Sequence, residues 1–182
     1  MNRETDEFEV IGGYTNTAPF LDEVCEAADA HRNSLGFIPK SVFDEFARRD
    51  NLYVLTESHP DGPHYAGHLL FERRFPRAHI VQMFVLEKYR RRGLATMLID
   101  HLRTSLTKDG FTSIRARVAE DLSAANAFWN RQGFYVQRVD QGGASRNRKI
   151  LVRWHELASP QLFPISGISA DNPLAWISTA EG

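Results

Sequence analysis

Three side chains are suited to proton transfer, and their types indicate what each could do. An imidazole has an ordinary pKa of about 6.5 and can accept a proton at cellular pH, which makes His79 a candidate base. A carboxylate such as Glu120 can do the same, and the phenol of Tyr135 can donate a proton. His79 could equally be a surface residue at a strand edge, and Tyr135 could simply pack on a strand. Further candidates are His68, Glu72 and Ser123.

A second chemical signal is a basic turn between an apolar run and a helix. Residues 78–86 form the apolar run, and a helical pattern follows Gly93. The first turn of a helix has N–H groups without partners inside the helix, and its dipole favours an anion. Gly93 lets the backbone approach such an anion closely. The turn therefore predicts a pyrophosphate site formed by Arg90, Arg91, Arg92, Gly93, Leu94, Ala95 and Thr96.

The same turn also has an ordinary interpretation, as a basic linker that precedes a helix. It lacks the Gly-x-Gly-x-x-Gly pattern of dinucleotide folds. It also lacks the Gly-Lys-Ser/Thr pattern of triphosphate-binding loops. Spacing alone leaves both interpretations open.

The composition narrows the classes of protein. The formal net charge is -1, whereas proteins that bind nucleic acid or anionic membranes are usually far more basic. No apolar run approaches the roughly 20 residues of a membrane span, and residues 1–9 do not resemble a secretory signal. The single cysteine, Cys25, excludes an internal disulfide and cysteine-based zinc, and no His/Asp/Glu group has metal-ligand spacing. We therefore expect a cytoplasmic protein without a metal.

The positions of apolar and turn-forming residues predict an α/β protein. Strands in the middle of the chain alternate with helices, and hairpins lie at both ends, which indicates a mixed sheet with helices on both faces. Strands are expected at 8–14, 51–57, 65–71, 78–86, 112–118, 134–139 and 149–156. Helices are expected at 17–33, 42–48, 94–108 and 123–132. We divide the chain into a domain, 1–157, and a Pro/Ser/Gly-punctuated tail, 158–182, that we expect to dock on this domain or on a second subunit.

Two segments carry a more specific signal. Arg90-x-x-Gly93-x-Ala95 stands between an expected strand and an expected helix, and residues 125–134 read Ala-Asn-Ala-Phe-Trp-Asn-Arg-Gln-Gly-Phe. In this order they resemble the Gln/Arg-x-x-Gly-x-Gly/Ala and Ala…Phe-Tyr/Trp…Gly-Phe motifs of the GCN5-related N-acetyltransferases, the GNAT family. The resemblance extends over residues 8–156 and implies that family's mostly antiparallel sheet of about seven strands.

The resemblance implies a site for acetyl-CoA. Backbone groups of Phe84 and Val85 would pair with the pantetheine arm, where the strand splays from its neighbour. Backbone N–H groups of 91–96 would cradle the pyrophosphate. His79 stands about where the histone-acetylating branch of the family has a glutamate. Residues expected beside the far end of the arm or the adenosine are Asn126, Trp129 and Arg131.

The chain departs from the family pattern where a proton donor is expected. The family often has a tyrosine acid directly after the motif's phenylalanine, and here that position is Trp129. It often has an asparagine six positions before that phenylalanine, and here that position is Leu122. Because an indole cannot act as an acid near neutral pH, we regard Tyr135 as the nearest replacement, with Ser123 and water as alternatives.

These residues together predict an acetyl-CoA-dependent N-acetyltransferase, in which an amine attacks directly in a ternary complex. A coenzyme-binding sensor or scaffold without turnover is an alternative that Trp129 and Leu122 keep open. An enzyme that acetylates aminoacyl-tRNA is a second alternative, because Arg73, Arg74 and Arg77 could line a path for phosphates. The acceptor amine is not identified by the sequence, and a homodimer is compatible with it.

Overall fold

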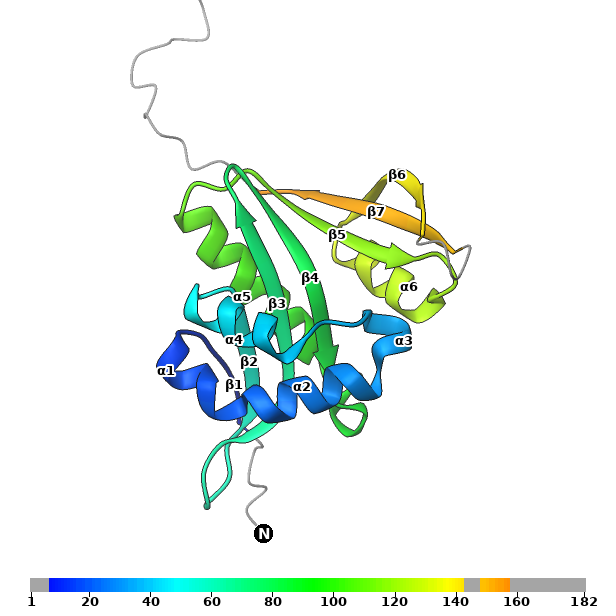
Figure 1. Ribbon diagram of the computed structural model, residues 1–182. Coiled ribbons are helices and arrows are strands. Elements are labelled where there is room, and N and C mark those ends of the chain that lie inside the picture. Colours follow the sequence, from blue (N-terminus) through cyan, green and yellow to red (C-terminus); the bar gives the residue numbers. More distant parts are fainter. Residues whose placement is uncertain (1–6, 143–147, 158–182) are drawn as a thin grey trace, which may run out of the picture.

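The computed structural model describes residues 7–142 and 148–157, which form a seven-stranded sheet with helices on both faces (Figure 1). The strand order is β1-β2-β3-β4-β5-β7-β6, and every neighbouring pair is antiparallel except β4 and β5. The predicted α/β class and the mostly antiparallel sheet of seven strands are confirmed. The strands are β1 (Phe8–Ile11), β2 (Leu52–Glu57), β3 (His64–Arg74), β4 (Arg77–Val85), β5 (Ser113–Ala119), β6 (Tyr135–Gln141) and β7 (Lys149–Glu156).

The helices lie in two groups, with α1–α4 on one face of the sheet and α5 and α6 on the other (Figure 1). The helix expected at 17–33 is divided into shorter helices. Pro19 lies at the start of a 3-10 helix, and the backbone leaves the helical conformation at His31 (φ -114°). The helices are α1 (Tyr14–Thr17), η1 (Ala18–Phe20), α2 (Leu21–Ala30), α3 (Arg32–Leu35), α4 (Lys40–Arg48), η2 (Glu87–Tyr89), α5 (Leu94–Lys108) and α6 (Ser123–Arg131).

Two hydrophobic cores lie on opposite faces of the sheet, and β4 contributes to both. One core packs α5 and α6 against the sheet through residues such as Leu98 and Trp129. The other packs α2 and α4 through residues such as Phe43. β4 gives Val85 to the first core and Phe84 to the second. A strand that is buried on both faces needs apolar side chains on both, which explains the near-continuous apolar run of the sequence.

β4 and β5 pair over only part of their length. Parallel pairing joins Arg77–Ile80 to Ser113–Ala116, yet both strands continue beyond it and diverge (Figure 1). Backbone groups of β4 that face β5 lose their strand partner there. On the opposite side, Gly67 of β3 allows β4 to approach closely, since a Cβ at this position would lie 2.4 Å from the carbonyl oxygen of Phe84. The sheet is therefore tight between β3 and β4 and open between β4 and β5.

β7 is the last described strand, and the division of the chain at residue 157 stays a prediction. β7 ends at Glu156, and the buried Leu157 donates its N–H to the carbonyl of Thr112 at 2.9 Å. The tail predicted at 158–182 lies outside the described residues. None of the helices in the described part of the chain combines the length and the apolar character needed to cross a bilayer.

Candidate active site

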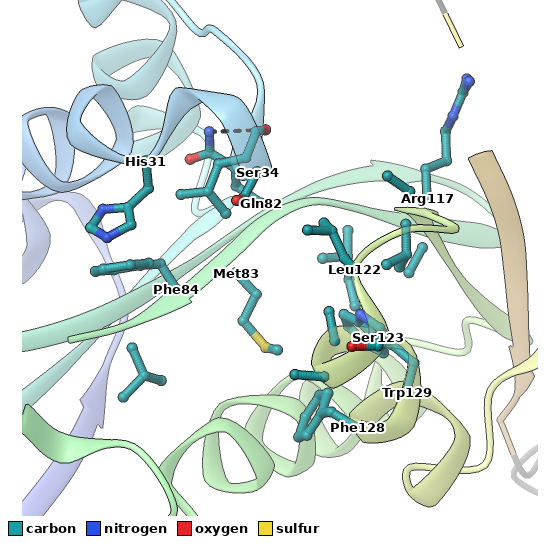
Figure 2. Close-up of a pocket in the computed structure, with 18 of the residues that line it drawn as sticks. His31, Ser34, Gln82, Met83, Phe84, Arg117, Leu122, Ser123, Phe128 and Trp129 are labelled. Carbon is teal, nitrogen blue, oxygen red and sulfur yellow. Dashed lines mark hydrogen bonds between the residues drawn. The ribbon is translucent and has the colours of Figure 1, made fainter. Parts of the chain in front are cut away.

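A cavity of about 580 Å³ opens where β4 and β5 diverge (Figure 2). Its walls come from the second half of β4, the second half of β5, the first turns of α6 and the segment around α3. Small-molecule sites usually have volumes of roughly 300–1,000 Å³, so the cavity is large enough for a ligand. Its lining includes His31, Ser34, Phe84, Arg90, Ser123 and Trp129.

The turn between β4 and α5 has an unusual backbone that exposes N–H groups. Arg91 (φ 61°) and Gly93 (φ 80°) are both left-handed, and Gly93 is the N-cap of α5. The N–H of Met97 donates to the carbonyl of Gly93 at 3.1 Å, so the three preceding N–H groups have no acceptor within the helix. No heavy atom lies within 4 Å of a Cβ built on Gly93, apart from its chain neighbours. The turn therefore offers converging donors with open space beside them, as an anion requires.

Arg90 ties this turn to the end of β4 and is the arginine of the turn that lines the cavity. Its Nε donates to the carbonyl of Val85 at 3.0 Å, and its guanidinium lies 5.5 Å from the ring centre of Phe84. The guanidinium of Arg92 lies 4.8 Å from the ring centre of Phe8, on β1. The charge of Arg90 is thus held at the mouth of the cavity, whereas Arg92 contacts another part of the sheet.

Thr96 remains a possible donor to an anion in the turn. Its Oγ1 accepts a hydrogen bond from Nε2 of Gln132 at 2.9 Å, which leaves the hydroxyl proton available. Gln132 follows the last residue of α6, so this contact also joins α6 to the first turn of α5.

Asn126 has a role within the fold. Its amide nitrogen contacts the carbonyls of Ala119, Glu120 and Leu122 at 2.9–3.1 Å. Its Oδ1 accepts from Nε and Nη2 of Arg153 at 3.2 and 2.9 Å. Both ends of the side chain are engaged, and Asn126 is not among the described residues that line the cavity. The sequence predicted that Asn126 contacts the coenzyme, but its side chain has no unengaged polar atom for such a contact.

Replacing Asn126 with alanine is expected to lower the free energy of unfolding by about 2–3 kcal/mol. The change removes two acceptor contacts from Arg153, whose side chain is only 2% exposed and cannot recover them from water. Urea unfolding measures the loss. Asn130→Ala removes one contact to the same guanidinium and serves as the milder control. An Asn126→Ala protein with wild-type stability and weakened acetyl-CoA binding would instead support the coenzyme role.

The other two α6 residues expected at the coenzyme lie in different environments. Trp129 lines the cavity but is largely buried, with Phe128 and Phe134 packed edge-on against it at 5.3 and 4.8 Å between ring centres. Arg131 is the last residue of α6 and lies outside the cavity lining in the described part of the chain. Trp129 thus shapes the wall of the cavity and anchors α6 to the core.

The structure does not bring His79, Glu120 and Tyr135 together at the cavity. Among the described residues, none of the three belongs to its lining. His79 lies on the paired part of β4, where burial and then the charge of Arg115 lower its pKa. Glu120 is exposed, 3.9 Å from Nζ of Lys149, and Tyr135 is 50% exposed on the edge strand β6. The sequence identified suitable residue types but could not assign their positions relative to the diverging strands.

His68, an alternative base, is sealed inside the second core. Its Nδ1 accepts from the hydroxyl of Tyr65 at 2.7 Å, and its Nε2 donates to Oε1 of Gln82 at 3.2 Å. The amide nitrogen of Gln82 in turn donates to the carbonyls of Leu35 and Gly36 at 3.4 and 3.5 Å. Burial lowers the pKa of His68 to about 4, so it is neutral at pH 7. Because both ring nitrogens are engaged, His68 positions Gln82 and has no site left for a substrate proton.

Acid is expected to destabilise the chain through His68. Its folded pKa of about 4 lies below the unfolded value of about 6.5, so the unfolded chain takes up a proton first as the pH falls. The stability that neutral His68 contributes is complete above pH ~6.5 and decreases by about 3 kcal/mol as the pH approaches ~4. Denaturant unfolding at neutral and acid pH measures the decrease. His68→Gln should lose less stability over the same interval, and an equal loss would contradict the assignment.

His31 is a cavity residue that the sequence did not single out. It lies between α2 and α3, with its ring 4.6 Å from that of Phe84 (Figure 2). Its Nδ1 is 3.0 Å from the carbonyl oxygen of Ala27, which can only accept, so Nδ1 carries the proton in this contact. In the neutral ring Nε2 then has the free lone pair. The four-residue spacing of Ala27 and His31 is compatible with their contact on a helix, but it does not show that His31 lines a cavity.

Arg148 connects two walls of the cavity region. Its Nη2 lies 2.6 Å from Oδ1 of Asp121, a residue of the cavity lining just before α6. Its Nη1 donates to the carbonyl of Asn33, in α3, at 3.0 Å. The three residues are far apart in sequence, and their contacts hold α3 against the start of α6.

The sheet opens between its two parallel strands beside the N-terminus of α5, an arrangement that suits a phosphate-bearing ligand. The chain belongs to the acetyltransferase (GNAT) family, whose model matches residues 21–134. The family uses acetyl-CoA as the donor in acetyl transfer, so the resemblance inferred from the two motifs is confirmed. The matched region contains the whole of the turn and α6 and ends at Phe134.

Several solved structures share the fold at low sequence identity. Ard1 from Thermoplasma volcanium has a TM-score of 0.71 at 16% identity, covering 84% of this chain and 99% of its own. The ribosomal-protein-S18-alanine N-acetyltransferase from Escherichia coli has a TM-score of 0.66 at 16% identity, covering 86% and 99%. The yncA protein from Salmonella typhimurium, solved with its cofactor acetyl-CoA, has a TM-score of 0.65 at 15% identity, covering 86% and 99%. No curated protein matches the sequence significantly.

Proposed function

We propose that this chain transfers the acetyl group of acetyl-CoA to an amine by direct attack within a ternary complex. The observation that carries the proposal is the divergence of β4 and β5 beside the N-terminus of α5. The cavity is lined from both faces of the sheet, by the α3 region on one and α6 on the other, which suits a donor and an acceptor that meet between the strands. The acetyl-CoA bound by the structurally similar Salmonella typhimurium protein supports the choice of donor.

The residues at the opening fit the coenzyme. The N–H groups of Leu94, Ala95 and Thr96 and the open space at Gly93 suit a pyrophosphate, and Arg90 adds positive charge at the rim. Backbone groups of β4 without a β5 partner suit the amides of a pantetheine arm. Acetyl-CoA, when bound, supplies a thioester as the activated acetyl group.

An acceptor ammonium must lose a proton before it can attack, and we assign this proton to Nε2 of His31. His31 lines the cavity, its Nδ1–H is held by Ala27, and its ring rests on Phe84. These contacts fix both the tautomer and the orientation of the ring. His31 thereby replaces His79, which lies outside the described lining, as the preferred proton acceptor.

The departing thiolate can take a proton from a hydroxyl or from water. Among the described residues of the lining, the hydroxyls are those of Ser34 and Ser123. Ser123 begins α6, on the wall that faces Met83 of β4 (Figure 2). Tyr135 points from the exposed edge strand, so Ser123 is the better-placed of the two candidates from the sequence.

Release of free thiol from acetyl-CoA tests the proposal directly. The chain is incubated with acetyl-CoA and a panel of small amines, peptides with free N-termini and lysine-containing peptides, and the thiol is followed with a colorimetric reagent. Amine-dependent release, together with mass spectrometry of an acetylated amine, is the expected result. Acetyl-CoA binding without release for any amine would support a coenzyme-binding sensor, the alternative that Trp129 and Leu122 keep open.

Replacing His31 with alanine is expected to lower kcat about 100-fold, the usual contribution of one general base. The dissociation constant of acetyl-CoA should change less than kcat does, because His31 contacts the ring of Phe84 and does not touch the turn between β4 and α5. His79→Ala is the matched comparison, since it removes a histidine of β4 that lies outside the described cavity lining. A large loss of kcat in His79→Ala and none in His31→Ala would reverse the assignment of the base.

The three arginines that suggested a charged tRNA as the acceptor have partners within the fold, which weakens that alternative. Arg73 contacts Asp109 at 2.5 Å and Arg74 contacts Glu72 at 2.8 Å, so their charges are offset within the fold. The guanidinium of Arg77 lies 5.3 Å from the ring centre of Trp154. A small or peptide amine is therefore the acceptor class that we propose.

A further inference from the structure

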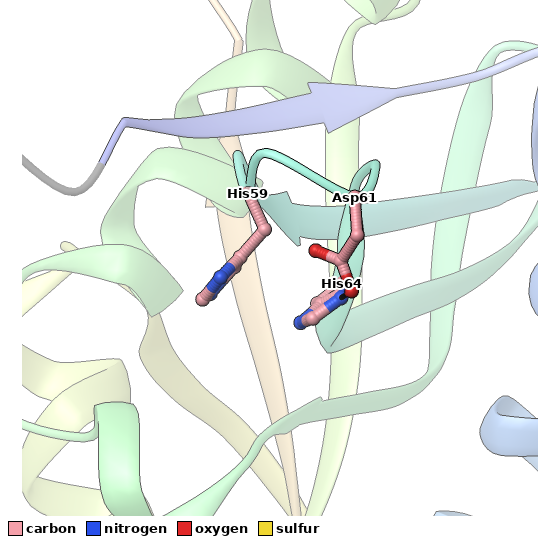
Figure 3. Close-up of side chains that lie close together, drawn as sticks. All are labelled: His59, Asp61 and His64. Carbon is pink, nitrogen blue, oxygen red and sulfur yellow. Dashed lines mark hydrogen bonds and ion pairs between the residues drawn. The ribbon is translucent and has the colours of Figure 1, made fainter.

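The tip of the β2–β3 hairpin carries three side chains that are not part of the coenzyme cavity. His59, Asp61 and His64 all point to the same side of the hairpin (Figure 3). One potential ligand atom from each of the three lies within 4.8 Å of those of the other two. The two imidazole rings are stacked, with 4.1 Å between ring centres and 16° between ring planes. Two imidazoles and one carboxylate thus lie together at the surface, and a rotation of the stacked rings would bring their nitrogens to bear on one ion.

The buried Glu57 sets the orientation of one ring. Its side chain is 8% exposed, and its Oε2 lies 2.8 Å from Nε2 of His59. A carboxylate accepts, so Nε2 of His59 carries a proton and Nδ1 has the lone pair in the neutral ring. A carboxylate behind a ligating histidine is the arrangement that fixes the tautomer in many metal sites.

The hairpin loop is stiff, which keeps the three side chains close together. Pro60 and Pro63 have fixed φ angles, and the N–H of Gly62 donates to the carbonyl of His59 at 3.0 Å. The three side chains come from only six consecutive positions, so little chain entropy is lost in holding them together. Oδ2 of Asp61 already lies 3.2 Å from Nε2 of His64.

We propose that His59, Asp61 and His64 form a site for a divalent transition metal of the zinc type. Two imidazoles and one carboxylate are ligands that Zn²⁺ accepts, and the exposed side of the cluster leaves a fourth position for water. The proposal departs from the sequence-based expectation of no metal, which rested on spacing, because the His-x-Asp-x-x-His spacing matches no regular element. The loop that folds back at Pro60 to Pro63 creates the convergence.

Hydrogen bonds link the cluster to the start of the turn between β4 and α5, residues 90–96. The same Oε2 of Glu57 that holds His59 also accepts from the hydroxyl of the buried Tyr89, and Tyr89 directly precedes Arg90. A metal that immobilises His59 therefore also immobilises Glu57 against Tyr89. We expect the metal to brace the hairpin against the rest of the sheet, and so to raise the melting temperature.

Zn²⁺ titration of the untagged, chelator-treated chain tests the proposal. Calorimetry should show saturable binding of one equivalent, and Co²⁺ in its place should give the visible ligand-field bands of a four- or five-coordinate site. His59→Ala and His64→Ala should each weaken Zn²⁺ binding at least about 10-fold. Each should also abolish the rise in melting temperature. His101→Ala, which removes an exposed histidine from α5, is the matched control and should bind as the wild type does.

Two outcomes would overturn the proposal. The first is a wild-type chain that shows no saturable Zn²⁺ binding at one equivalent. The second is a cluster variant, folded by circular dichroism, that binds Zn²⁺ as tightly as His101→Ala does. The readouts require neither acetyl-CoA nor an amine, so they are independent of the proposed acetyl transfer.

Discussion

Gly93→Val is expected to weaken acetyl-CoA binding at least about 1,000-fold, or ~4 kcal/mol. Gly93 is left-handed at φ 80°, a conformation that a β-branched residue adopts only with strain. The substitution therefore shifts the backbone whose N–H groups converge on the pyrophosphate, and hydrogen bonds to a charged group are worth about 1.5–3 kcal/mol each. Calorimetric titration with acetyl-CoA measures the loss.

Gly110→Val is the matched control for this substitution. Gly110 follows the other end of α5, is left-handed at φ 78°, and likewise has no heavy atom within 4 Å of a built Cβ. The two variants therefore carry similar backbone strain, and only Gly93→Val alters the turn. Acetyl-CoA affinity that is equal in the two variants would remove the turn from the coenzyme site.

Ala125→Trp is expected to abolish acetyl-CoA binding by filling the opening between the strands, again with a loss of about 1,000-fold or ~4 kcal/mol. Ala125 is a half-buried residue of α6 that lines the cavity. An indole there occupies the space that a pantetheine arm requires. Because Ala125 also packs against the first core, the melting temperature is expected to fall, and binding must be measured well below it.

Ala127→Trp separates occlusion from general damage to α6. Ala127 is exposed on the same helix and lies outside the described cavity lining, so its replacement keeps the opening free. We expect near-wild-type acetyl-CoA binding from this variant. A folded Ala125→Trp protein that binds as well as Ala127→Trp does would mean that the coenzyme does not enter between β4 and β5.

Much of the fold could be predicted because its elements are encoded locally. The apolar run that becomes β4, the helical stripe of α5 and its ending at Gly110 depend on residues close in sequence. The turn between β4 and α5 was predictable as a structural element for the same reason, since its strand, linker and helix are consecutive. The division of the first long helix at His31 was missed, because no glycine or proline marks it.

The remaining parts of the site depend on contacts between distant residues. Asn126 is engaged by Arg153, twenty-seven positions later in the chain, which no helical spacing predicts. His31 is part of the site because β4 places Phe84 against its ring. The side chains of the hairpin cluster lie together because their loop folds back. Predictions on the location of the protein, a homodimer and the tail at 158–182 stay predictions.

A crystal structure with bound coenzyme A tests the central claim most directly. The account predicts the pyrophosphate within hydrogen-bonding distance of the N–H groups of 94–96, and the pantetheine arm beside Phe84 and Val85 in the opening between β4 and β5. It also predicts the sulfur in the cavity between His31 and Ser123, which come from opposite walls. Coenzyme bound away from the turn, with the opening filled by side chains, would contradict the account.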